Sequence, residues 1–205
     1  MKDGGLKVTF SEVLRGFSTA ESPSFGEIRI KHFNNFDSAE LDVKNKDFYD
    51  KAVNQGLTTR EERIDYLLKE NIWKEELLGF TAEAYASRRI NEHYMFNAIL
   101  GGNDEKLFGR QEFEELEEAK MTELIGMYNK STNKFNSNTL KLVSVSGFYS
   151  NLFHLCNDDA YVFYGKPLIQ LTFYQIELFG YGRYHKSLIE NSEHKPPEEI
   201  TQDPQ

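Results

Sequence analysis

The chain contains 205 residues, of which 39% are hydrophobic, 28% charged and 14% aromatic, and its formal net charge is −9. The aromatic content is too high for a wholly disordered chain, and the single cysteine, Cys156, excludes an intrachain disulfide framework. No apolar run reaches the roughly 20 residues that cross a bilayer, and no apolar signal core follows Met1. We therefore expect a protein that is neither secreted nor inserted in a membrane.

Residues 1–37 are predicted to form a small N-terminal segment of strands and loops. Residues 6–10 and residues 27–31 alternate apolar and polar side chains, as half-buried strands do. Residues 19–26 between them contain Ser, Pro and Gly and predict a loop. Because two short strands are not stable alone, they are expected to pair with each other on a helical body or with a strand of another chain.

Residues 38–192 show helical periodicity and predict one mainly α domain, a compact bundle of five or six helices with the small N-terminal β element beside it. Capping boxes are predicted over residues 58–61 and over residues 172–175. The only tryptophan, Trp73, is interpreted as a packing anchor. The last part of the chain, residues 193–205, is acidic and rich in proline and is predicted to be disordered. Further helices are predicted over residues 74–100, 111–129, 139–156 and 173–190.

No catalytic, cofactor-binding or metal-ligating residue is predicted. The five histidines lack the spacing at which ligands on one helix converge on a metal. Cys156 follows an apolar run, which favours a buried thiol over a nucleophile. Gly180 and Gly182 lie inside a predicted helix, where they indicate close helix packing or a kink.

Two other function classes remain open. One is an enzyme whose site is assembled from scattered side chains, and it predicts that at least two of five groups meet in one cavity: His93, His154, His185, Glu83 and Glu92. The other is a nucleic-acid accessory factor that uses Lys166, Arg183, His185 and Lys186. The negative net charge opposes binding to a phosphate backbone, so nucleic acid is not the expected partner.

Three groups of residues resemble proteins of tailed bacteriophages that build the virion or assemble its tail or capsid. The groups are residues 56–61 leading to 71–73, residues 81–86, and residues 163–167 followed by 171–172 and 174–175. The resemblance covers about residues 48–184. It implies a structural or assembly role, a location in the host cytoplasm or the virion, and other virion or assembly proteins, or a second copy of the chain, as partners.

The expected function is therefore protein–protein interaction without catalysis. Strand 27–31, with Ile28 and Ile30, or strand 6–10 is predicted to add to the edge of a partner's sheet, where main-chain hydrogen bonds supply affinity. Exposed aromatic side chains are the predicted anchors of this contact, because interfaces concentrate binding energy in aromatic residues. The predicted anchors are Tyr161, Phe163, Tyr164 and Tyr181.

Overall fold

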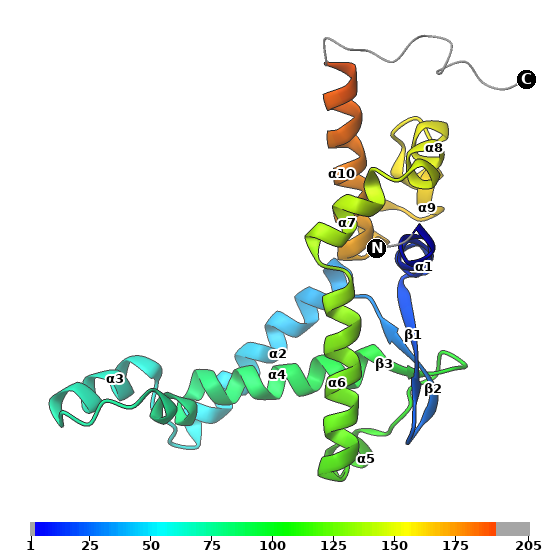
Figure 1. Ribbon diagram of the computed structural model, residues 1–205. Coiled ribbons are helices and arrows are strands. Elements are labelled where there is room, and N and C mark those ends of the chain that lie inside the picture. Colours follow the sequence, from blue (N-terminus) through cyan, green and yellow to red (C-terminus); the bar gives the residue numbers. More distant parts are fainter. Residues whose placement is uncertain (1–2, 192–205) are drawn as a thin grey trace, which may run out of the picture.

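A computed structural model of the protein describes residues 3–191 (Figure 1). Within this range the chain is mostly helical, with ten α-helices, two 3-10 helices and one three-stranded antiparallel sheet. The predicted mainly α fold with a small β element near the N-terminus is confirmed, whereas five or six helices is too few. The acidic tail over residues 193–205 lies outside the described residues, and the division near residue 37 stays a prediction.

The N-terminal segment begins with a helix, α1 (Asp3–Arg15), so the predicted strand over residues 6–10 is wrong. Leu6, Phe10 and Val13 follow a helical spacing and are all buried. The prediction failed because an alternation over only five residues does not distinguish a strand from one face of a helix. The predicted loop over residues 19–26 is also wrong over its first half, residues 19–22, because β1 (Phe17–Ser22) occupies them.

The predicted strand over residues 27–31 is confirmed as β2 (Gly26–Lys31). It is the central strand of the sheet and pairs antiparallel with β1 on one edge and with β3 (Ile99–Gly101) on the other. Its buried face belongs to the first hydrophobic cluster, called here the sheet cluster, which also includes side chains near α5 (Arg110–Glu114) and on α6 (Glu118–Lys134). The sheet cluster consists of Ile28, Ile30, Met95, Ala98, Ile99, Phe108, Phe113 and Leu124.

A second cluster, the helical cluster, joins α1 to four helices of the C-terminal part of the chain. These are α7 (Ser137–Ser144), α8 (Gly147–Leu155), α9 (Ala160–Tyr164) and α10 (Phe173–Glu190), which follows the 3-10 helix η2 (Leu168–Gln170). Its buried members are Leu6, Phe10, Val13, Phe135, Leu140, Val143, Tyr149, Phe153, Leu178 and Phe179. The helices therefore pack around two clusters rather than in one bundle.

Gln175 fixes α1 to the start of α10. Its side chain is fully buried; Nε2 donates to the carbonyl oxygens of Val13 (2.9 Å) and Leu14 (3.0 Å), and Oε1 accepts from the Thr172 amide. The capping box predicted over residues 172–175 is thus confirmed. The Val13 carbonyl also accepts from the Gly16 amide (3.2 Å), so Gln175 adds a second hydrogen bond there and supplies one to the Leu14 carbonyl at the C-terminal end of α1.

The third part of the molecule is a helical arm, residues 35–98, which projects away from the sheet (Figure 1). It consists of α2 (Asn35–Asn54), α3 (Arg60–Lys69), the 3-10 helix η1 (Glu75–Phe80) and α4 (Ala82–Ala98). In Figure 1, α2 and α4 lie side by side and α3 lies at their far end. The capping box of α3 uses Thr59 and Glu62, one residue later than predicted.

Local signals explain why the predicted helices are divided. The helix predicted over residues 74–100 begins with η1, and α4 starts only after Thr81, whose Oγ1 accepts from the Ala84 amide at 3.3 Å. The helix predicted over residues 139–156 breaks at Ser146, which precedes Gly147. Periodicity therefore finds the helical regions but not the short interruptions inside them.

Candidate functional site

The structure excludes the predicted strand addition. β2 has no free edge at residues 28–30, since β1 pairs with it along its whole length and β3 pairs with these three residues on the other side. Ile28 and Ile30 are 0% and 1% exposed in the sheet cluster and do not reach a surface. The other candidate, residues 6–10, is part of α1. The prediction that Ile28 and Ile30 bind a partner is therefore wrong, because both belong to the core.

The four predicted aromatic anchors lie in different settings. Tyr161 on α9 is exposed (62%). Phe163 and Tyr164 pack against the helical cluster, and the Tyr164 hydroxyl donates to the Gln175 carbonyl oxygen at 2.9 Å. Tyr181 also packs against this cluster, and its hydroxyl donates to Glu177 at 3.0 Å. Their role in partner binding stays a prediction, with Tyr161 as the one ring that stands open to solvent.

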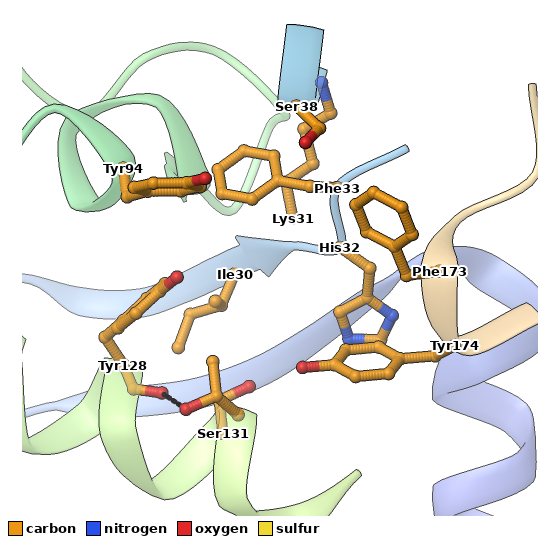
Figure 2. Close-up of a pocket in the computed structure, with 11 residues that line it drawn as sticks. Ile30, Lys31, His32, Phe33, Ser38, Tyr94, Tyr128, Ser131, Phe173 and Tyr174 are labelled. Atoms are coloured by element: carbon orange, nitrogen blue, oxygen red, sulfur yellow. Dashed lines mark hydrogen bonds between the residues drawn. The ribbon is translucent and has the colours of Figure 1, made fainter. Parts of the chain in front are cut away.

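A cavity of about 250 Å³ lies where the arm, the sheet and α10 meet (Figure 2), and we call it the junction cavity. One main-chain hydrogen bond, from the Phe173 amide to the Phe33 carbonyl oxygen (3.0 Å), closes this junction. The arm, β2, α6 and α10 all contribute to the walls. The lining residues are Ile30, Lys31, His32, Phe33, Ser38, Tyr94, Tyr128, Ser131, Thr132, Phe173 and Tyr174.

Three tyrosines from three helices project into the junction cavity: Tyr94 of α4, Tyr128 of α6 and Tyr174 of α10 (Figure 2). Within residues 3–191, none of their hydroxyl groups has a hydrogen-bond partner, although each can both donate and accept. Burial first, and then the neighbouring Tyr174 and Tyr94, raise the pKa of Tyr128 to about 12. The pKa values of Tyr94 and Tyr174 are raised too, first by burial and then by Asp42 and Glu177 respectively. The phenol groups are therefore neutral near pH 7.

His32 forms the buried end of the cavity wall. Ser131 Oγ donates to Ser18 Oγ (2.9 Å), and Ser18 Oγ lies 2.9 Å from His32 Nε2. Because Ser131 supplies the proton between the two hydroxyls, Ser18 can donate its own proton to Nε2, and the remaining imidazole proton is then on Nδ1. Among the described residues Nδ1 has no hydrogen-bond partner. The imidazole instead packs edge-to-face against Phe135 and Tyr174, at 4.6 and 5.0 Å between ring centres.

Burial first, and then the nearby ammonium group of Lys134, lower the pKa of His32 from 6.5 to about 3. Lys134 is itself paired with the carboxylate of Glu12, a buried side chain of α1. The imidazole is consequently neutral at all pH values near 7. It contributes its shape and, within the described range, an unpaired Nδ1–H donor to the wall, not a charge.

The end of the arm presents a second candidate site. Five large apolar side chains between residues 66 and 80 are exposed there, and we call them the tip residues: Tyr66 (51%), Leu68 (61%), Ile72 (46%), Trp73 (51%) and Phe80 (69%). They come from α3, from the connection that follows it and from η1. The interpretation of Trp73 as a packing anchor is therefore wrong. A group of exposed apolar side chains of this kind marks an interaction site more often than a single one does.

The side chains named for an enzyme site are dispersed. His93 Nδ1 lies 3.0 Å from Arg110 Nη1, and His185 Nδ1 lies 2.9 Å from Ser144 Oγ. Glu83 accepts a hydrogen bond from the Arg60 amide on the arm. No hydrogen bond or ion pair within residues 3–191 joins any two of the five candidates His93, His154, His185, Glu83 and Glu92. The predicted convergence is absent.

Neighbouring groups also act on two other residues that the sequence singled out, Lys186 and Cys156. Lys186 pairs with Asp158 (2.6 Å) and with Glu190 (3.8 Å), so its charge is already compensated. Cys156 is half-buried, and burial followed by the nearby Asp159 raises the pKa of its thiol, which opposes a thiolate nucleophile.

In the part of the chain that the structure describes, no three His, Cys, Asp or Glu side chains are placed to hold a metal ion. Over the same residues, every helix is too short or too polar to cross a membrane.

Comparisons of the chain with protein-family models, with curated proteins and with solved structures find no match.

Proposed function

We propose that this chain is a non-enzymatic interaction protein, a structural component or assembly factor of a bacteriophage virion, and that it binds its protein partner through the tip residues. The observation that carries this proposal is the exposure of Trp73, Phe80 and their three neighbours at the far end of a projecting arm. The virion setting rests on the sequence resemblance to proteins of tailed bacteriophages.

The construction of the arm supports this assignment. Three of the buried side chains of α2 and α4, Ala52, Ala82 and Ala86, are alanines, which let the two helices approach closely but bury little apolar area. The large buried apolar side chains of the arm outside the sheet cluster are Leu41, Leu67 and Ile90. Larger apolar side chains therefore remain on the outside of the arm. A helical pair with so small a core gains stability when a partner covers its exposed apolar surface.

Charged residues lie in the same segment of the arm as the tip residues. The segment that contains them also carries Arg63 and Lys69 on α3 and Glu75 and Glu76 at the start of η1. An apolar centre with a charged and polar rim is the usual anatomy of a protein–protein interface. Trp and Tyr are also the side chains that most often dominate binding energy there. Trp73 and Tyr66 are therefore the expected anchors.

The test is size-exclusion chromatography with light scattering, first on the protein alone and then with each candidate virion protein. The variant Trp73→Ser, combined with Phe80→Ser, removes the two largest anchors, and Leu155→Ser is the matched control because Leu155 is equally exposed (71%) but lies on α8. We expect the tip variant to lose association by at least tenfold and the control to retain it. Equal binding by both variants, or no association of the unmodified protein with itself or with any candidate, would contradict the proposal.

A further inference from the structure

We propose that the junction cavity is a binding site for a small, neutral, single-ring compound that carries hydrogen-bonding groups such as an amide or a carbonyl. This inference is independent of the partner proposed for the tip residues. It rests on three observations of the cavity: its size, the three tyrosine hydroxyls without partners, and the pairing of the charged groups that border it.

The size of the cavity sets the size of the ligand. Pockets for drug-sized molecules occupy roughly 300–1,000 Å³, and a water molecule takes up roughly 30 Å³ in the liquid. A volume of about 250 Å³ therefore suits one substituted ring rather than a nucleotide or a peptide. Phe33, Phe173 and the three tyrosines surround this space with aromatic rings (Figure 2), and such walls favour a planar guest that can stack or make edge contacts.

The hydroxyl groups set the polarity of the ligand. Tyr94, Tyr128 and Tyr174 reach the same space from three sides (Figure 2), and within the described range their hydroxyls make no hydrogen bond to the protein. A polar group in a confined apolar space gains most when a ligand or an ordered water satisfies it. A ring that carries carbonyl and amide groups offers acceptors and donors to all three. A purely apolar ring leaves them unpaired.

The surrounding charges favour a neutral ligand. Lys31, the one charged side chain in the wall, is already paired with Asp37 at 2.7 Å. Lys134, beside His32, is paired with Glu12. The carboxylates of Asp42 and Glu177 stand near Tyr94 and Tyr174 and oppose an anion, while the two lysines oppose a cation. An ionic ligand would thus lose its hydration without gaining a free counter-charge.

The test uses four single-ring probes that differ in charge and polarity: benzamide, toluene, benzoate and benzyltrimethylammonium. Binding to the full chain is measured by saturation-transfer NMR and by isothermal titration calorimetry. We expect benzamide to bind and toluene to bind about three- to tenfold more weakly, which is the usual effect of losing one or two hydrogen bonds. We expect no binding of benzoate or of benzyltrimethylammonium. Tighter binding of either ion than of benzamide, or no binding of any probe at millimolar concentration, would overturn the proposal.

Two variants locate the binding to this cavity. Tyr128→Phe keeps the ring and removes one hydroxyl, and we expect it to weaken benzamide binding about three- to tenfold without changing toluene binding. Tyr184→Phe removes the hydroxyl of an exposed tyrosine on α10 and is expected to bind both probes as the unmodified protein does. Thermal unfolding of each variant establishes that it is folded, and Tyr94→Phe provides a second test on a different helix. Unchanged benzamide binding by both cavity variants would place the probe elsewhere and refute the site.

Discussion

The burial of His32 predicts that this protein loses stability in mild acid, and the variant His32→Phe isolates the effect. Phe preserves an aromatic ring between Phe135 and Tyr174 but cannot take up a proton. The variant also removes the contact with Ser18, which changes stability by a similar amount at every pH. The informative quantity is therefore the difference in free energy of unfolding between the two proteins, followed as a function of pH.

The sign and size of the effect follow from the two pKa values. The imidazole has a pKa of about 3 in the folded protein and 6.5 in the unfolded chain. As the pH falls below 6.5 the unfolded chain binds a proton that the folded protein does not bind, so stability is lost progressively between pH 6.5 and 3. Between pH 7 and pH 5 the loss amounts to about 2 kcal/mol, and it approaches about 5 kcal/mol below pH 3. At pH 5 carboxyl groups of ordinary pKa are still mostly ionised, so that their contribution there is small.

Urea unfolding at pH 7, 6 and 5 measures this difference. We expect His32→Phe to reduce the loss of stability between pH 7 and pH 5 by about 2 kcal/mol relative to the unmodified protein. His154→Phe, at an exposed histidine of α8, is the matched control and should follow the unmodified protein. Parallel pH profiles for the unmodified protein and His32→Phe would show that the imidazole is not held neutral by burial, and the reasoning would fail.

Three further predictions concern packing and exposure. Gly182→Ala should lower the free energy of unfolding by about 1–3 kcal/mol in urea unfolding, because its Cβ would lie 2.6 Å from the buried Tyr149 hydroxyl. Gly180→Ala, with open space around its Cβ, should instead raise this free energy by about 0.5–1 kcal/mol, and equal effects at the two glycines would contradict the packing. Gln175→Leu should cost about 2–3 kcal/mol by the same measurement, since it leaves buried main-chain groups unpaired; a neutral effect would refute the capping role. Trp73 should show the emission and acrylamide quenching of a solvent-exposed indole, and a blue-shifted, protected emission would place it in the core.

The sequence predicted those features that depend on near neighbours. The capping box of α10 needs only Thr172 and Gln175, three residues apart, and it was placed correctly. The strand over residues 27–31 was also correct, because its two isoleucines alternate with charged residues. Gly182 was linked to close helix packing, and the structure places Tyr149 and Phe153 against it. For the capping box and the strand the physical cause lies within one turn or one strand, whereas the packing partners of Gly182 lie on a different helix, α8.

The predictions failed where a distant contact decides between two local possibilities. Leu6 and Phe10 fit a short strand as well as one face of a helix, and it is the cover supplied to that face by α7, α8, α9 and α10 that favours the helix. The prediction that residues 27–31 add to a partner's sheet is wrong for the same reason. Nothing in the segment indicates that β3, about seventy residues later, occupies its second edge. Main-chain pairing over such distances leaves no pattern in the strand itself.

The two candidate sites also depend on which side chains stay exposed, and the sequence does not predict this. Tyr94, Tyr128 and Tyr174 lie on three separate helices that meet around one space, and within residues 3–191 their hydroxyls make no hydrogen bond. Trp73 is a large apolar side chain of the kind that cores contain, but among the described residues no further helix lies over the end of the arm to cover it. Burial of an apolar side chain depends on which distant segment packs against it, and the sequence around that side chain does not identify the segment. Side chains that the fold leaves exposed or without a partner, such as Trp73 and the three tyrosine hydroxyls, are therefore the most informative about binding.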